Sequence, residues 1–204
     1  MQNIKAIIFD LGGVLLDIDF KKVCTSFKTL GANNFEEIYS QHECDPIFEN
    51  LETGKISEED FCLALKKYTK ESVTNKEIAD AWNSILLDFR LSSLNSLKKL
   101  KNKYSLFLLS NTNTIHQQAF NKIFENTVGE GSFNSFFDKA YYSHEIGLRK
   151  PNADAYQYIL QENNLQPYET LFIDDTPGNI EGAKAVGMPT ILLTKEMKIE
   201  DLDL

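Results

Sequence analysis

Two neighbouring carboxylates end an apolar segment in the last third of the sequence. The run Leu171-Phe172-Ile173 is followed by Asp174 and Asp175, and adjacent carboxylates repel each other unless a cation lies close to them. The apolar run at residues 6–9 likewise ends on Asp10, just before a leucine and two glycines. The acid pair therefore indicates a bound cation, and Asp10 indicates a charged group at the edge of a sheet.

Two further polar segments could contribute to the same site. Ser110 and Asn111 close another apolar run, and the basic pair Arg149-Lys150 stands directly before Pro151. Taken singly, such segments are more often loops, helix caps or solvated faces. All four segments fall at or just beyond the ends of expected strands, where ligands bind in open α/β sheets. Their joint presence predicts one functional site.

Apolar runs alternate with helical patterns along most of the chain. The runs predict strands, and the patterns between them predict helices. The expected strands span residues 4–10, 105–110, 139–142, 170–174 and 190–193, and the expected helices span 91–100, 114–124, 153–161 and 179–186. This alternation predicts an α/β fold with a Rossmann-like three-layer core, in which helices cover both faces of a parallel sheet.

One block interrupts the alternation. Between about residues 18 and 89 the sequence shows helical patterns and no convincing strand. Ser57, followed three residues later by Asp60, is typical of a capping box at the start of a helix. We therefore expect an inserted helical cap at residues 17–91, and a core formed by residues 1–16 and 92–204.

The composition limits the possible partners. A net charge of −9 over 204 residues argues against nucleic acid and anionic membranes as partners, and no apolar run is long enough to span a bilayer. The three cysteines, Cys24, Cys44 and Cys62, stand far apart, which is typical of reduced thiols rather than of a zinc site. We expect a cytoplasmic protein that binds a small molecule.

The four polar segments together resemble the motifs of the haloacid dehalogenase-like hydrolase superfamily, in the order in which that family carries them. The stretches FDLGGVLLDIDF, SNTNTIH, LRKP and FIDDTPGNIEGA are most similar to those of small bacterial α-glucose-1-phosphate phosphatase-type members. The resemblance covers the whole chain and implies a Mg²⁺-dependent phosphatase with a helical cap. Its substrate would be a small phosphorylated metabolite, such as a hexose 1-phosphate.

The resemblance assigns the nucleophile and the metal ligands. Asp10 would attack phosphorus and form an aspartyl-phosphate. Mg²⁺, which prefers a few oxygen ligands plus water, would be held by Asp10, by the backbone carbonyl of Gly12, by Asp175 directly and by Asp174 through a water molecule.

The resemblance also assigns the groups that hold the phosphate. Ser110 and the backbone near Asn111 would hydrogen-bond the phosphoryl oxygens, with Arg149 as a further candidate. Lys150 would neutralise the crowded anions, which is the main requirement of phosphoryl transfer. Asn179 would order the loop that carries the acid pair.

Gly12 departs from the family's pattern. Phosphatases of the superfamily usually carry an aspartate at this position, which protonates the leaving alcohol and later activates water. Three alternatives stay open: a phosphatase that works without this acid, a haloacid dehalogenase, and a catalytically degenerate phosphate-binding protein. The acid pair disfavours the dehalogenase, because carbon–halogen displacement in this fold needs no magnesium. An anomeric hydroxyl leaves more readily than an ordinary alcohol, which favours a sugar 1-phosphatase.

Other residues could replace the missing acid or contact the substrate. Asp17 and Asp19 begin the insertion, although helix capping is the more common role for such residues. His116 could face the site, although a structural role is more typical. Within the cap, Phe48 and Glu52 are predicted to approach the substrate.

Three residues are expected in ordinary structural positions. Trp82 should lie in the core of the cap, on a helix that also carries Ile85 and Leu86. His42 and His144 should lie at surface or loop positions. None of these side chains is predicted to act on the substrate.

Overall fold

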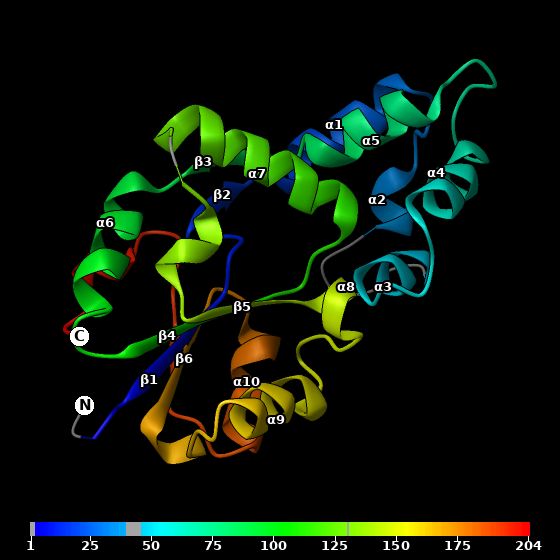
Figure 1. Ribbon diagram of the computed structural model, residues 1–204. Coiled ribbons are helices and arrows are strands. Elements are labelled where there is room, and N and C mark those ends of the chain that lie inside the picture. The colour runs from blue at the N-terminus through cyan, green and yellow to red at the C-terminus, as the bar shows by residue number, and fades with distance from the viewer. Residues whose placement is uncertain (1–2, 40–45, 130) are drawn as a thin grey trace.

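A five-stranded parallel sheet forms the centre of the molecule in the computed structural model, which describes residues 3–39, 46–129 and 131–204. The strand order is β5-β4-β1-β6-β7 (Figure 1). The strands are β1 (Ala6–Phe9), β4 (Ser105–Ser110), β5 (Lys139–Tyr142), β6 (Thr170–Asp174) and β7 (Thr190–Leu192). The predicted α/β fold is confirmed, with slightly shorter first and last strands. His42 and Cys44 lie outside the described residues.

Helices cover both faces of this sheet. Side chains alternate between the faces of a strand, so Ile7 and Phe9 of β1 enter one hydrophobic core while Ala6 and Ile8 enter another. The first core is covered by α6 (Leu91–Leu100) and α7 (Thr114–Val128), and the second by α9 (Ala153–Glu162) and α10 (Pro177–Ala185). These helices confirm the three-layer arrangement (Figure 1).

The strand register brings the polar segments to one edge. Phe9 lies opposite Leu108 of β4 on one side and Ile173 of β6 on the other. The next residues, Asp10 and Asp174, therefore emerge side by side at the carboxyl edge of the sheet, where ligands bind in parallel α/β folds.

A helical layer with its own core lies beside the sheet (Figure 1). Within the described part of the chain its helices are α1 (Phe20–Thr29), α2 (Phe35–Ile38), α3 (Pro46–Glu52), α4 (Glu58–Lys66) and α5 (Asn75–Asn83). Aromatic side chains, among them Phe27, Phe61 and Trp82, fill its centre. The predicted capping box of α4 is present, because the Asp60 amide donates to Ser57 Oγ at 3.1 Å and the Ser57 amide donates to Asp60 Oδ2 at 3.3 Å.

Two short strands join this layer to the sheet. β2 (Leu16–Ile18) and β3 (Leu86–Phe89) pair antiparallel in a sheet of their own. The prediction that residues 18–89 contain no strand is therefore wrong at both ends, and so is the placement of Ile85 and Leu86 on the Trp82 helix, which ends at Asn83. Segments of three or four residues show no readable alternation, and their pairing joins positions far apart in the sequence. A cap at residues 17–91 stays a prediction.

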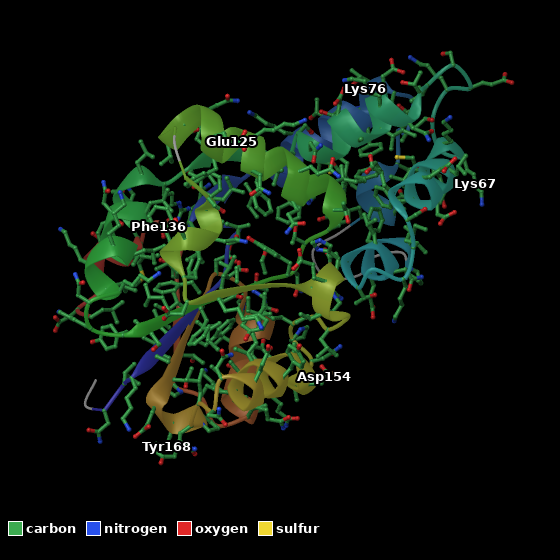
Figure 2. All side chains as sticks on the ribbon, viewed as in Figure 1. Lys67, Lys76, Glu125, Phe136, Asp154 and Tyr168 are labelled. Carbon is green, nitrogen blue, oxygen red and sulfur yellow. The ribbon has the colours of Figure 1, made fainter. Side chains whose placement is uncertain are left out.

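The remaining elements are short. They are α8 (Ser143–Ile146) and the 3-10 helices η1 (Phe133–Phe136), η2 (Pro167–Glu169) and η3 (Ile199–Asp201). Figure 2 shows the exposed side chains of Lys67, Lys76, Glu125 and Asp154 at the periphery, whereas Phe136 is buried. Within the described ranges, every helix is too short or too polar to cross a membrane.

Candidate active site

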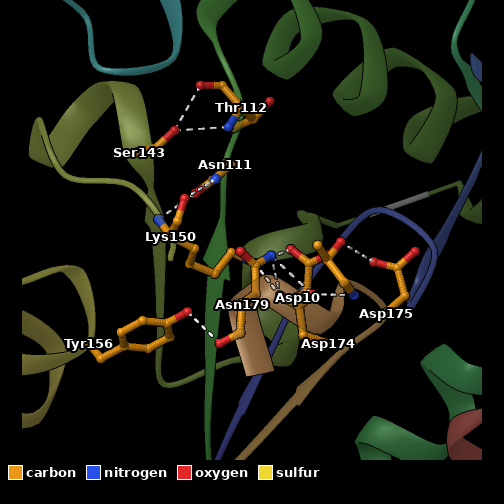
Figure 3. A network of polar contacts seen from close by, with 10 residues as sticks. Asp10, Asn111, Thr112, Ser143, Lys150, Tyr156, Asp174, Asp175 and Asn179 are labelled. Carbon is orange, nitrogen blue, oxygen red and sulfur yellow. Dashed lines mark hydrogen bonds and ion pairs between the residues drawn. The ribbon is translucent and has the colours of Figure 1, made fainter. Parts of the chain in front are cut away.

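Two of the predicted acids meet a buried lysine at the carboxyl edge of the sheet (Figure 3). Lys150 Nζ lies 2.5 Å from Asp10 Oδ1 and 2.7 Å from Asp174 Oδ2, and the lysine side chain is only 1% exposed. Asp10 follows β1, Asp174 ends β6, and Lys150 comes from the loop before α9. Three distant segments thus bring one cation and two anions into contact.

Asp175 completes a set of oxygen donors. Asp10, Asp174 and Asp175 each place a carboxylate oxygen within 4.8 Å of the other two. Three convergent carboxylates are hard oxygen ligands, which fit a divalent cation such as Mg²⁺. The predicted convergence of the acids is therefore present. Gly12 lines the same cavity, and its assignment as a carbonyl ligand stays a prediction.

Gly13 permits this convergence. Its φ is +74°, and a Cβ placed on it would lie 1.9 Å from Asp175 Oδ2. Any side chain at this position would displace the carboxylate and would also strain the backbone. The sequence interpretation missed this role, although the second glycine of a Gly-Gly pair just after a strand is a usable signal for a close approach.

The site holds more negative than positive charge. Burial raises the pKa of Asp10 to about 7; the Lys150 ammonium opposes this shift, and the carboxylates of Asp174 and Asp175 add to it. Burial alone would lower the pKa of Lys150, but Asp10 and Asp174 outweigh it and raise that pKa above its ordinary value. Burial, together with the adjacent Asp174, also raises the pKa of Asp175. Three acids around one lysine leave a charge that a divalent cation would neutralise.

The loop after β6 is fixed by hydrogen bonds to Asp174. Asn179 Nδ2 lies 3.0 Å from both of its carboxylate oxygens, and the Thr176 amide donates to Oδ1 at 2.8 Å. The Tyr156 hydroxyl in turn donates to the Asn179 carbonyl at 2.7 Å. Asn179 thus orders this loop, as expected, whereas the role of Tyr156 was not predicted from the sequence.

Asn111 positions the backbone of Lys150. Its Nδ2 donates to the Lys150 carbonyl at 2.8 Å, and its Oδ1 accepts from the Lys150 amide at 2.9 Å. Ser143 fixes the next residue, because its Oγ accepts from the Thr112 amide at 2.9 Å and donates to the Thr112 carbonyl at 3.0 Å. The Asn111 side chain is thus engaged, which leaves main-chain groups for phosphate. Nothing in the sequence marked Ser143.

A cavity of about 460 Å³ opens over these groups, between the sheet edge and the helical layer. Asp10, Ser110 and Lys150 line it from the sheet, and Glu52 lines it from α3. Ser110, predicted to hold phosphate, is 3% exposed and lies at the end of β4. The placement of Glu52 therefore agrees with its predicted approach to the substrate.

Phe48 does not line the cavity, and its predicted approach to the substrate is wrong. It is 2% exposed, and its ring centroid lies 5.3 Å from that of Trp82 in the centre of the helical layer. Trp82 is itself 1% exposed, so its predicted core position is confirmed. Large aromatic side chains maximise buried area, and on α3 that preference directs Phe48 inward. His144 lies in α8 with a side chain only 8% exposed, rather than at the expected surface or loop position.

The two aspartates suggested as substitutes for the missing acid are engaged elsewhere. Asp17 Oδ1 accepts from Arg90 Nε at 2.7 Å. Asp19 caps α1, with its Oδ1 accepting from the Lys21 amide at 2.9 Å. Helix capping, the ordinary role considered for both residues, is confirmed for Asp19, whereas Asp17 ties β2 to the residue after β3.

His116 lines the cavity but is held as a structural group. Its Nε2 lies 3.2 Å from the Trp82 carbonyl, its Nδ1 lies 3.2 Å from Asn113 Nδ2, and its ring stacks on Trp82 at 4.7 Å. Burial lowers its pKa to about 4. The neutral ring has both nitrogens occupied, so it holds the helical layer against α7 rather than transferring protons.

The geometry agrees with what is known of similar proteins. The family described as haloacid dehalogenase-like hydrolase matches residues 4–187. The chain belongs to the haloacid dehalogenase-like hydrolases. Among curated members, it is 33% identical to the D-ribitol-5-phosphate phosphatase of Bacteroides thetaiotaomicron, over 92% of this chain and 90% of that enzyme. It is 29% identical to a sesquiterpene phosphatase of Aspergillus oryzae, over 95% and 91% of the two chains.

A solved structure of this family has the same fold. A mutant of a B. thetaiotaomicron family enzyme, crystallised with magnesium and inorganic phosphate, superposes with a TM-score of 0.91 at 33% identity, covering 97% of this chain and 98% of the other. The resemblance seen in the sequence is therefore confirmed, and the protein is a hydrolase of the haloacid dehalogenase-like fold.

Proposed function

We propose that this haloacid dehalogenase-like hydrolase is a Mg²⁺-dependent phosphatase that acts on a small phosphorylated sugar or sugar alcohol. The convergence of Asp10, Asp174 and Asp175 within 4.8 Å, beside a lysine and under a cavity, carries the proposal. Relatives over nearly the whole chain are named as phosphatases, and a similar enzyme was crystallised with magnesium and phosphate. The free thiols of Cys24 and Cys62 support a cytoplasmic location within this proposal.

Each residue has a defined task in this chemistry. Asp10 attacks phosphorus and forms an aspartyl-phosphate as the bond to the leaving oxygen breaks, and the leaving alkoxide takes a proton from solvent water. A second water molecule then hydrolyses the aspartyl-phosphate and releases inorganic phosphate and free Asp10. Lys150 holds Asp10 in line and neutralises the phosphoryl oxygens. Ser110 donates to one of those oxygens. Bound Mg²⁺, held by the three acids and the Gly12 carbonyl, would supply charge neutralisation for the transferring phosphoryl group.

We propose two candidate substrates. A hexose 1-phosphate suits Gly12, because an anomeric alcohol needs less protonation to leave than an ordinary alcohol. D-Ribitol 5-phosphate, the substrate in the name of the 33% identical relative, is the second candidate. The cavity volume of about 460 Å³ falls in the usual range of small-molecule sites and accepts either.

A phosphate-release screen tests the function. Purified protein is incubated with Mg²⁺ and a panel that contains glucose 1-phosphate, ribitol 5-phosphate, p-nitrophenyl phosphate and 2-chloropropionate. We expect phosphate release that is abolished by EDTA, restored by Mg²⁺ and absent in Asp10→Asn. Chloride release alone would favour a dehalogenase, and no release of either ion would favour a catalytically degenerate phosphate-binding protein.

A further inference from the structure

The cavity has a charged wall where the helical layer meets the sheet. Glu52, the last residue of α3, and Arg149, next to Lys150, both line the cavity. Glu52 Oε2 lies 2.9 Å from Arg149 Nη2, and the two side chains are 16% and 29% exposed. Arg149 therefore points toward the helical layer, and its charge is largely matched by a carboxylate rather than left free for phosphate.

This pair has hydrogen-bonding capacity that the protein does not use. Glu52 Oε2 and Arg149 Nε are both shielded from solvent, and neither has a hydrogen-bond partner, although Oε2 lies 2.9 Å from Nη2 in the ion pair. Buried polar groups normally find partners, and an unpaired one is costly. Glu52 has only to turn toward the cavity that it already lines to offer an acceptor to a ligand.

The charge of Glu52 determines which part of a substrate can bind at the wall formed by Glu52 and Arg149. The 2.9 Å contact with Arg149 makes the wall a paired carboxylate and guanidinium; burial raises the pKa of Glu52, and the Arg149 charge opposes that rise. A dianionic phosphate would be repelled by the Glu52 carboxylate. In the proposed mechanism the phosphate is bound instead by Lys150, by Ser110 and by the Mg²⁺ that the three acids would hold. A hydroxyl group, which is both donor and acceptor, satisfies a carboxylate oxygen and an arginine N–H together.

We propose that Glu52 and Arg149 form a hydroxyl-recognition wall that selects polyhydroxylated phosphate esters over apolar ones. This inference rests on the proposed phosphatase function and names the residues that set its substrate class. Apolar side chains such as Ile18 and Leu86 also line the cavity, and they suit the C–H face of a sugar or polyol. An apolar alcohol would leave Glu52 Oε2 and Arg149 Nε without hydrogen-bond partners, and a site built to hydrogen-bond hydroxyl groups discriminates strongly against ligands that lack them.

Glu49 provides a matched control for Glu52. It lies on the same helix, and its Oε2 is 3.8 Å from Arg149 Nη1, but its side chain is 51% exposed and is not part of the cavity lining. The test measures kcat/KM of wild type, Glu52→Gln and Glu49→Gln with ribitol 5-phosphate, glucose 1-phosphate and n-pentyl phosphate. The n-pentyl ester matches ribitol 5-phosphate in carbon number and lacks its hydroxyls.

We expect wild type to prefer at least one hydroxylated ester over n-pentyl phosphate by about 100-fold or more. Glu52→Gln should lower kcat/KM for that ester about 10- to 100-fold, mainly through KM, and change n-pentyl phosphate less than about 3-fold. Glu49→Gln should leave kcat/KM unchanged for all three esters.

Two results would overturn the inference while leaving the phosphatase function intact. One is a wild type that hydrolyses n-pentyl phosphate as well as both hydroxylated esters, which requires no variant to fold. The other is an equal loss for all esters in Glu52→Gln, which would make Glu52 a purely structural contact. No release from any ester, p-nitrophenyl phosphate included, would instead refute the phosphatase function and this inference with it.

Discussion

Replacing Gly12 by aspartate should change which step of the reaction is slow. An ideal Cβ on Gly12 would lie 3.3 Å from Ile18 Cδ1 and 3.6 Å from Ile18 Cγ2, and Gly12 does not have a positive φ. The backbone therefore accepts a side chain, and the closest obstacle is the flexible end of an isoleucine. Since valine lacks Cδ1, Ile18→Val removes that obstacle, and the double variant Gly12→Asp/Ile18→Val is the best test of a restored acid.

The expected effect is large because the attacking water is the same for every substrate. Without a carboxylate at position 12, hydrolysis of the aspartyl-phosphate lacks general-base help worth about 10²- to 10⁴-fold, or about 3–5 kcal/mol. Dephosphorylation of Asp10 should therefore limit the wild type. The double variant should raise kcat within that range, most of all for phosphates of ordinary alcohols, while Ile18→Val costs about 0.5–1.5 kcal/mol of stability.

Rapid-quench kinetics with p-nitrophenyl phosphate show directly whether hydrolysis of the aspartyl-phosphate limits turnover. Wild type should release a burst of p-nitrophenol approaching one equivalent per enzyme, followed by a slower steady rate that varies little among good leaving groups. The burst should shrink in the double variant and vanish in Asp10→Asn. A wild type with no burst, whose steady rate follows leaving-group acidity, would refute the reasoning and show that another group activates the water.

Three further predictions concern the structural support of the site. Lys150→Met leaves buried Asp10 and Asp174 without their cation; urea denaturation should show a loss of about 3–5 kcal/mol, and kcat/KM should fall at least about 100-fold. Gly13→Ala should displace Asp175 and weaken Mg²⁺ binding measured by calorimetry, whereas Gly129→Ala, with φ +90° and no neighbour within 4 Å, should cost only stability. The pKa of His116 is lowered from 6.5 to about 4, so the fold favours its neutral form; about 3 kcal/mol of stability should be lost as pH falls from 6.5 to 4. His116→Gln should flatten that part of the urea-denaturation pH profile, and an unchanged profile would contradict the assignment.

Local sequence patterns were sufficient to predict most of the fold. Five apolar runs became the five strands of the sheet, and the helix at residues 91–100 was placed without error. Where the prediction failed, at β2 and β3, the strands are short and stabilised by pairing with each other. The prediction for Phe48 failed for a related reason. The sequence shows that a helix carries apolar residues, but it does not show which neighbouring element each of these side chains contacts.

The sequence by itself determined which chemical groups the protein has and that they stand at strand ends. Asp10, Ser110, Lys150 and the pair Asp174-Asp175 could be named from it because strand-end positions in a parallel sheet share one edge. Only the tertiary structure decided how these groups act on one another. The contact of Lys150 with two carboxylates, the space that Gly13 leaves for Asp175, and the pairing of Arg149 with Glu52 all join segments far apart in the chain. Such contacts depend on distances of a few ångström between separately folded elements, which no local pattern of residues encodes.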